Sequence, residues 1–120
     1  MAAPNIVNVT TIIGKTAGLA VTGTASAIVS NSAASNKVLK INTLLITNVD
    51  GVNAADITAD IFKNQTTAFD IASTITVPAD SSLVLISKDN PIYLEENDSL
   101  RLLASATGDL EAVCSYEEIS

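Results

Sequence analysis

The feature that most constrains this chain is a period of two in its apolar residues, repeated in short runs that end at turn signals. The clearest run is Phe69–Val77, where odd positions, all apolar except Ser73, alternate with polar or small residues at even ones. No stretch combines a helical period with capping residues. Such runs, at a spacing of roughly ten residues, predict eight to ten strands in an all-β protein.

A single domain of 120 residues with this many short strands predicts a two-sheet antiparallel β-sandwich. Its wiring is jelly-roll or immunoglobulin-like, and we favour the jelly roll. We divide the domain into a low-charge N-terminal arm with its strands, residues 1–36, and a sandwich core, residues 37–120. The arm is expected at subunit or partner contacts.

The longest apolar run, Lys37–Val49, changes face part-way along, and we interpret the change as a β-bulge near Asn42-Thr43. Asp50-Gly51 and Pro78-Ala79-Asp80 are turn signals. The inward positions of the alternating runs predict a core that includes Ile57, Ile61, Phe69, Ile71, Ile75, Leu83, Leu85, Leu100, Leu102 and Cys114.

The C-terminal segment, Pro91–Ser120, contains two alternating runs, Leu100–Ala106 and Leu110–Tyr116. Gly108-Asp109 separates them. Two alternating runs around a Gly-containing break predict a β-hairpin.

Charge is divided unevenly along the chain. The net charge is −7, but residues 1–49 contain three lysines and no acid, while residues 50–120 contain thirteen acids and three bases. The acidic balance argues against binding to nucleic-acid phosphates. Before Lys37 the only charge is Lys15, a pattern that suits a segment covered by a partner. We therefore predict partner contacts at Ile6, Val7, Val9, Ile12, Ile13, Leu19 and Val21.

Residues that could carry chemistry are few. The sequence has no His to activate its single cysteine, Cys114, which we expect to be a buried structural thiol. Glu95, Glu96 and Asp98 form the densest acidic group, but with four aromatic residues and no Trp we expect a solvated loop rather than a hydrolase cleft. Asp50–Asp56 has oxygen ligands at a loosely calcium-like spacing, which a turn held by Asp and Asn side chains explains better. We predict no catalytic residue, cofactor or metal.

No run is long enough for a membrane span, and the N-terminus lacks the positive region of a secretory signal, so we expect neither a membrane contact nor a leader. Strands built of Ala, Gly, Ser, Thr and Val are poor at standing alone. We therefore expect a homo-oligomer, most simply a trimer.

Three stretches together carry a resemblance to a known family: NTLLITNVDG, TITVPADSS and the ending LEENDSLRLLASATGDLEAVCSYEEIS, all between Asn42 and Ser120. With them the chain resembles small virion structural proteins of tailed bacteriophages, above all those of contractile-tailed phages of cyanobacteria. The resemblance implies a non-enzymatic protein located in the virion, whose partners are the major capsid protein or neighbouring virion proteins.

The small acidic sandwich with an uncharged first third suits a capsid decoration (cement) protein that stabilises the outer shell. A neck or tail accessory protein is the nearest alternative. A host-surface glycan-binding module is a further alternative, which an exposed Tyr93 in a shallow groove beside Asp98 would favour.

Overall fold

The computed structural model describes residues 5–120 and contains nine strands and no helix in that range. No helix in the described part of the chain is therefore long and apolar enough to cross a membrane. The predicted all-β class is confirmed. The strands are β1 (Ile12–Ala20), β2 (Ser26–Ser30), β3 (Val38–Asn48), β4 (Ala55–Lys63), β5 (Thr67–Val77), β6 (Ser82–Ile86), β7 (Ile92–Leu94), β8 (Ser99–Ala104) and β9 (Leu110–Ile119).

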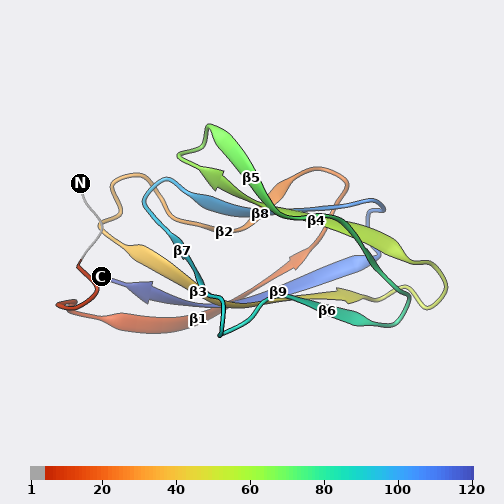
Figure 1. Ribbon diagram of the computed structural model, residues 1–120, viewed down its shortest axis with the longest axis horizontal. Coiled ribbons are helices and arrows are strands. Elements are labelled where there is room, and N and C mark those ends of the chain that lie inside the picture. Colours follow the sequence, from red (N-terminus) through yellow and green to blue (C-terminus); the bar gives the residue numbers. More distant parts are fainter. Residues whose placement is uncertain (1–4) are drawn as a thin grey trace.

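The strands form two antiparallel sheets that pack face to face (Figure 1). Sheet A has the order β1-β9-β3-β6, and β7 pairs with a different part of β3 from the one that pairs with β6. Sheet B has the order β2-β8-β4-β5. Successive strands alternate between the sheets except at β4 and β5, which are paired neighbours in sheet B, and β6 and β7 share one strand position in sheet A. This is the pattern of a jelly roll. The sandwich is elongated, measuring 49 × 26 × 19 Å.

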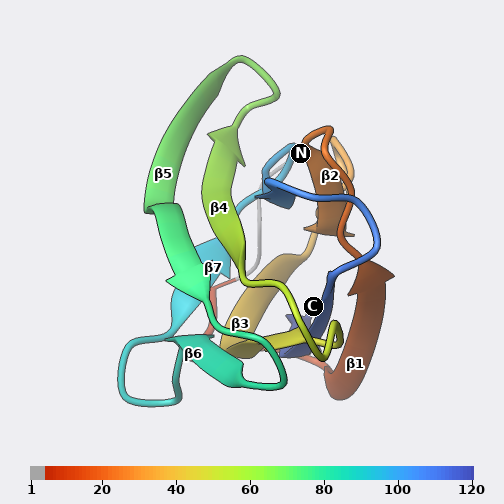
Figure 2. The same ribbon diagram turned by 90° about the vertical axis from the view of Figure 1, so that its right-hand side faces the viewer.

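Residues 12–30 are part of this sandwich, because β1 supplies one edge of sheet A and β2 one edge of sheet B. The two strands lie on the same side of the molecule, while β5 and β6 lie on the opposite side (Figure 2). Residues 12–30, within the low-charge part of the chain, thus form one flank of the molecule.

The predicted C-terminal hairpin is wrong. β8 belongs to sheet B and β9 to sheet A, so the residues between them carry the chain across the sandwich. Backbone bonds fix this crossing: Ala104 N–H donates to the Thr22 carbonyl, and Ser105 N–H donates to the Asp56 carbonyl, each at 2.9 Å. Gly108 has a φ of 93°, a left-handed conformation that glycine adopts without strain. Gly-Asp marks the turn correctly but does not say which strands it joins.

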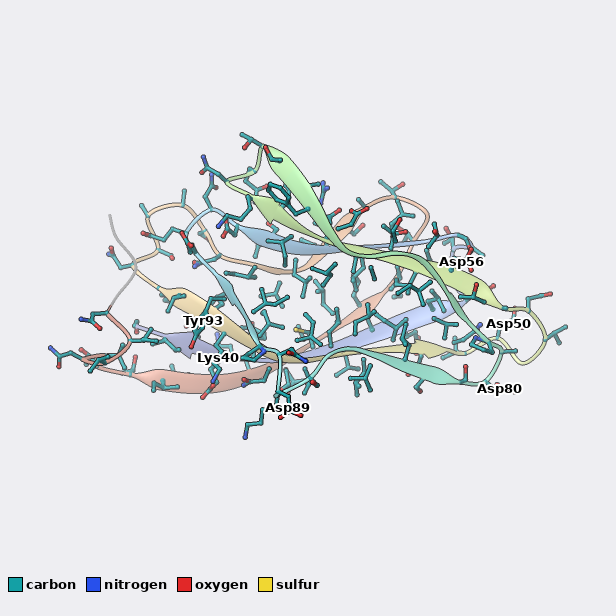
Figure 3. All side chains as sticks on the ribbon, viewed as in Figure 1. Lys40, Asp50, Asp56, Asp80, Asp89 and Tyr93 are labelled. Carbon is teal, nitrogen blue, oxygen red and sulfur yellow. The ribbon has the colours of Figure 1, made fainter. Side chains whose placement is uncertain are left out.

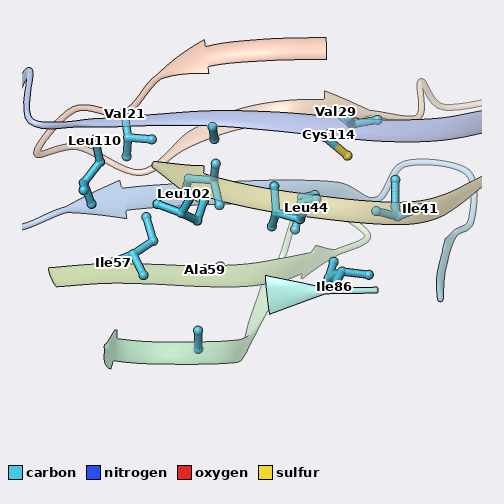
Figure 4. Packing of buried hydrophobic residues seen from close by; sticks show 14 of the residues in the cluster. Val21, Val29, Ile41, Leu44, Ile57, Ala59, Ile86, Leu102, Leu110 and Cys114 are labelled. Atoms are coloured by element: carbon cyan, nitrogen blue, oxygen red, sulfur yellow. The ribbon is translucent and has the colours of Figure 1, made fainter. Parts of the chain in front are cut away.

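The faces assigned to these two strands are nevertheless correct. Leu100, Leu102 and Cys114 are completely buried, as is Ile57 on β4, while Ile61 is 8% exposed. These side chains interdigitate between the sheets with those of β3 and β9 (Figure 4). Leu83 and Leu85, also predicted as core, are partly buried and pack against this cluster.

The predicted bulge in the long strand is confirmed. The β3–β9 register passes from Ile41 opposite Tyr116 to Thr43 opposite Ser115, which leaves Asn42 as the extra residue. The bulge keeps Ile41 and Leu44 both on the inner face, where each is completely buried.

The core prediction is wrong for β5. Phe69, Ile71 and Ile75 are 59%, 37% and 39% exposed, and the buried side chains of this strand are those of Ala72 and Val77. β5 is an edge strand, so its apolar side chains have neighbours on one side only. Phe69 and Ile75 lie directly opposite the buried Ile61 and Ile57, so they are on the inner face and stay exposed because the strand is at the edge. Two irregularities in the pairing with β4 bring Ala72 onto that face and leave Ile71 as an extra residue, which strict alternation cannot reveal.

Candidate assembly interface

Four exposed apolar residues gather where the described chain begins. Ile6, Val7, Ile12 and Ile13 are 49%, 89%, 56% and 48% exposed, and we call them the N-terminal apolar cluster. Their segment is held beside the C-terminus, because the N–H groups of Thr10 and Thr11 both donate to the Ser120 carbonyl at 2.8 Å. The cluster therefore has a fixed position at the left-hand end of the molecule in Figure 1.

The other three predicted contact residues lie elsewhere. Val9 and Leu19 are half-buried, and Leu19 packs against the core. Val21 is completely buried in this chain's own core, and its N–H donates to the Leu110 carbonyl at 2.9 Å (Figure 4). A residue with no exposed surface cannot touch a partner, so we do not carry Val21 forward as a contact.

Lys15, the one charged residue of β1, forms a salt bridge within the chain. Lys15 Nζ lies 3.1 Å from Glu118 Oε2, and Lys37 Nζ lies 2.8 Å from Glu118 Oε1. Hydrogen bonds from Lys37 and then Lys15 hold the pKa of Glu118 below its usual value near 4.5. The bridge leaves this flank with little free charge to offer an ionic partner.

A second exposed apolar row crosses the outer face of sheet A, and sequence reasoning missed it. Val113, Leu45 and Val84 are 46%, 38% and 57% exposed. Leu45 pairs with Val113 on one side and with Val84 on the other, so their side chains share one face. Their parity, opposite to that of the core residues on the same strands, was the available signal.

The opposite end of the molecule is acidic. Asp50, Asp56 and Asp80 lie together at the right-hand end in Figure 3, and Asp109 lies beside Asp50. The loops of this end, residues 21–25, 49–54, 78–81 and 105–109, contain no lysine or arginine. The two ends of the long axis therefore differ in character, one bearing the apolar cluster and the other negative charge.

The Asp50–Asp56 segment is a turn held by its own side chains. Asp50 Oδ1 accepts bonds from Val52 N–H at 2.8 Å and Asn53 N–H at 3.2 Å. These backbone bonds, in that order, keep the pKa of Asp50 below its usual value. Across residues 5–120 no three acidic, His or Cys side chains come together in a way that could hold a metal ion.

The acidic loop before β8 has a structural function. Asp98 is 1% exposed, and its carboxylate accepts bonds from Lys63 Nζ at 2.7 Å, Asn64 N–H at 2.9 Å and Glu95 N–H at 3.0 Å. Asp98 thereby fastens the β4–β5 turn to the β7–β8 turn, and it also raises the pKa of Lys63 through the same hydrogen bond. Such a buried carboxylate is satisfied and is not free to act on a substrate.

Tyr93 and Asp98 do not form the exposed pair that a glycan site would require. Tyr93 is 43% exposed on sheet A, opposite Lys40 (Figure 3). Asp98, by contrast, is buried and bonded to the turns around it.

Cys114 is a buried thiol, as expected. It is completely buried on the inner face of β9, and this burial raises its pKa to about 12. At neutral pH the side chain is therefore a protonated thiol, which is a weak nucleophile.

Comparison with known proteins supports the fold but identifies no family. No protein-family model and no curated protein matches the chain. A solved structure described by the words "Bacillus endospore appendages form a novel family of disulfide-linked pili" aligns over 100% of this chain and 96% of its own, with a TM-score of 0.54 and 14% sequence identity. At this identity the likeness shows that the two chains share a β-sandwich fold.

Proposed function

We propose that this chain is a non-enzymatic structural protein of a tailed-phage particle, and specifically a decoration protein that adheres to the outside of the capsid shell. The resemblance of its sequence to phage virion proteins suggests the particle. The difference between the two ends of the molecule supports the mode of attachment.

That difference is the observation that carries the proposal. The N-terminal apolar cluster, Ile6, Val7, Ile12 and Ile13, lies at one end, and the aspartates of the loops lie at the other (Figures 1 and 3). Exposed apolar side chains gain free energy when a partner removes them from water. A molecule that attaches by the apolar end turns its acidic end outward, where like charge keeps decorated particles apart.

The bonding of the charged side chains also favours a structural role. Asp98 joins two turns, and Asp60 accepts two bonds from the Arg101 guanidinium, at 2.9 and 3.1 Å. Arg101 in turn stacks over the Phe62 ring at 3.9 Å. These carboxylates are engaged in bonds that stabilise the sandwich.

Two valines at opposite ends provide a matched test. Val7 is 89% exposed in the apolar end and Val52 is 83% exposed in the acidic end, so the same substitution can be made at either without disturbing the core. The protein is mixed with phage heads that lack it, and bound protein is measured after sedimentation of the heads. We expect Val7→Asp to weaken binding at least about tenfold and Val52→Asp to leave it unchanged.

The salt dependence separates an apolar contact from an ionic one. Because the predicted contact is made by apolar side chains, binding should survive moderate salt, which screens exposed ion pairs. Equal binding by the two variants, or release of the native chain by moderate salt alone, would contradict the attachment described here. Binding to purified necks or tails instead of heads would support the alternative, an accessory protein of the neck or tail.

A further inference from the structure

Most edges of the two sheets carry features that discourage pairing with another strand. β2 is short and has an extra residue, Ile28, in its pairing with β8. β5 has extra residues at Ile71 and at Ser73–Thr74. β6 and β7 are short, with a bulge at Leu85 and with Pro91 between them. Short strands, bulges and proline are the usual protections of a sheet edge.

β1 lacks these protections. All nine of its residues pair with β9 in one unbroken register, from Ile12 opposite Ile119 to Ala20 opposite Glu111. The strand contains no proline, and its one charge, Lys15, is bridged to Glu118. Of the sheet edges in the described residues, β1 is the regular one.

The pairing with β9 determines which backbone groups of β1 are free. Thr11 and Ser120 exchange two backbone bonds of 2.8 and 2.9 Å, and Val21 N–H donates to the Leu110 carbonyl. Because bonding alternates along an antiparallel pair, the odd residues of β1 bond to β9 and the even ones point away from it. Within residues 5–120, the N–H and C=O groups of β1 that are not bonded to β9 therefore belong to Ile12, Gly14, Thr16, Gly18 and Ala20.

Two of these residues are glycines that this chain's own packing does not require. A Cβ built on Gly14 would meet no atom within 4 Å, and one built on Gly18 would meet the Ala112 carbonyl oxygen at an ordinary 3.9 Å. Neither residue has a positive φ. Glycine weakens a strand, and in this setting it suits the close approach of another backbone.

A shallow hollow of about 290 Å³ lies beside the free edge. Gly18 and Ala20 leave it open, and Val113 and Glu111 flank it on β9. Ile12, at the other end of the same strand, is 56% exposed and has the same parity as Gly18 and Ala20, so its side chain projects from the same face. The strand thus presents both a projecting side chain and a hollow.

We propose that two copies of this chain pair through β1, antiparallel, about a two-fold axis that passes beside Thr16. In this register Thr16 faces the partner's Thr16, and Gly14 faces the partner's Gly18. Ile12 faces the partner's Ala20 and enters the hollow beside it, which leaves Ile6, Val7 and Ile13 of the N-terminal apolar cluster for the shell. Lys15 faces the partner's Ala17, so no like charges oppose each other across the pair. Sheet A then continues from one copy into the next.

The symmetry of this contact sets the size of the assembly. A two-fold contact uses the same surface on both copies and closes on itself, so it gives a dimer. The trimer expected from the sequence would need two different surfaces on each subunit. The dimer does not depend on attachment to a phage particle and is tested in its absence.

Cysteine substitution tests the register directly. Opposed residues that exchange both backbone bonds have Cα atoms about 5.5 Å apart, within the range that a disulfide spans. Thr16→Cys should therefore form a covalent dimer under mild oxidation. Ala20→Cys should not, because two copies of that position would lie about 27 Å apart in this register. The native Cys114 is buried and does not interfere.

The outcomes decide the proposal. A dimer of the native chain in sedimentation, with cross-linking at position 16 and not at 20, supports it. A native chain that sediments as a monomer or a trimer at the concentration used for cross-linking overturns it, as does equal cross-linking at both positions.

Filling the hollow provides a second test, which separates an effect on dimerisation from an effect on folding. Gly18→Val adds a β-branched side chain where the folded chain has room, so its thermal midpoint should stay the same or rise. Dimerisation should weaken at least about tenfold, because the added side chain blocks the partner's Ile12. Ser73→Val on the bulged edge of β5 is the control and should leave dimerisation unchanged. Unweakened association of the Gly18→Val variant would overturn the proposal.

Discussion

β1 and β5 are both edge strands, on opposite flanks of the sandwich. Their sequences suggest that β5 is the more regular strand, but the structure shows the opposite. β5 is rich in β-branched and aromatic residues and shows the clearest alternation in the chain, yet its backbone is irregular at Ile71 and at Ser73–Thr74. β1 is built largely of small residues, including Gly14 and Gly18, and yet pairs with β9 without a single shift. Strong side-chain propensity therefore accompanies the protected edge, and regular geometry accompanies the open one.

The comparison shows what makes a sheet edge available to another strand. A strand can be joined only where its free N–H and C=O groups form an unbroken row. β5 exposes more apolar surface, including Phe69 at 59%, but its bulges interrupt that row. β1 exposes less apolar surface along its middle but keeps the row intact. Three tests of this contrast follow, in order of decreasing effect.

The largest difference is expected between two isoleucines that pair across β4 and β5. Ile57 is completely buried, whereas Ile75, directly opposite, is 39% exposed. Ile57→Ala should lower the free energy of unfolding by about 2–5 kcal/mol, and Ile75→Ala by about 1 kcal/mol or less. Urea denaturation of both variants measures the difference. Similar losses of unfolding free energy in the two variants would mean that β5 contributes to the core as fully as β4 does. That result would contradict the description of β5 as an edge strand with exposed apolar residues.

A smaller effect of opposite sign is expected at the bend in β5. Thr74 has a φ of 47°, a left-handed conformation that is unfavourable for a β-branched residue. Thr74→Gly should relieve this strain and raise the free energy of unfolding by up to about 1 kcal/mol. Ser73→Gly, at a neighbouring residue without a positive φ, should be neutral or destabilising. A drop in thermal midpoint for Thr74→Gly would show that the bend is not strained.

The smallest effect concerns the ion pairs that neutralise β1. Because its pKa in the folded chain lies below the usual value, ionised Glu118 stabilises the fold at and above that value. This contribution disappears as the pH falls through the lowered pKa. Lys15 and Lys37 are 44% and 40% exposed, so screening by solvent keeps the contribution below about 1 kcal/mol. Glu118→Gln should be slightly less stable than the native chain at neutral pH and equally stable in strong acid. A stability difference that persists in strong acid would assign the effect of Glu118 to packing instead of charge.

The sequence predicts the faces of the central strands well, for a physical reason. β8 and β9 are flanked by neighbours and covered by the opposite sheet, so burial follows parity closely, as at Leu102 and Cys114. An edge strand has a neighbour on one side only, so even a side chain on its inner face can stay exposed. Alternation is a property of the strand, whereas position within a sheet depends on strands far along the chain. Phe69 and Ile75 were therefore assigned to the core in error.

The candidate interface was predictable in part. The exposed cluster of Ile6, Val7, Ile12 and Ile13 follows from apolar residues in a segment nearly free of charge. Glycine within a strand is a weak point that a sequence can reveal, but the open space around Gly14 and Gly18 is a property of the folded chain. The C-terminal hairpin failed for a similar reason, since a chain that crosses between sheets needs the same turn residues as one that doubles back.

The burial of Cys114 has a consequence for the reversibility of the proposed assembly. The single thiol of the sequence is shielded inside the sandwich, so the proposed contacts between subunits would be made without covalent bonds from it. A subunit that docks in the wrong orientation can leave again, because its release requires only the separation of strand edges and apolar contacts. Addition of a reductant should leave such an assembly unchanged, whereas dilution should take it apart. Order would then build up through repeated exchange of subunits until each copy occupies its most stable position.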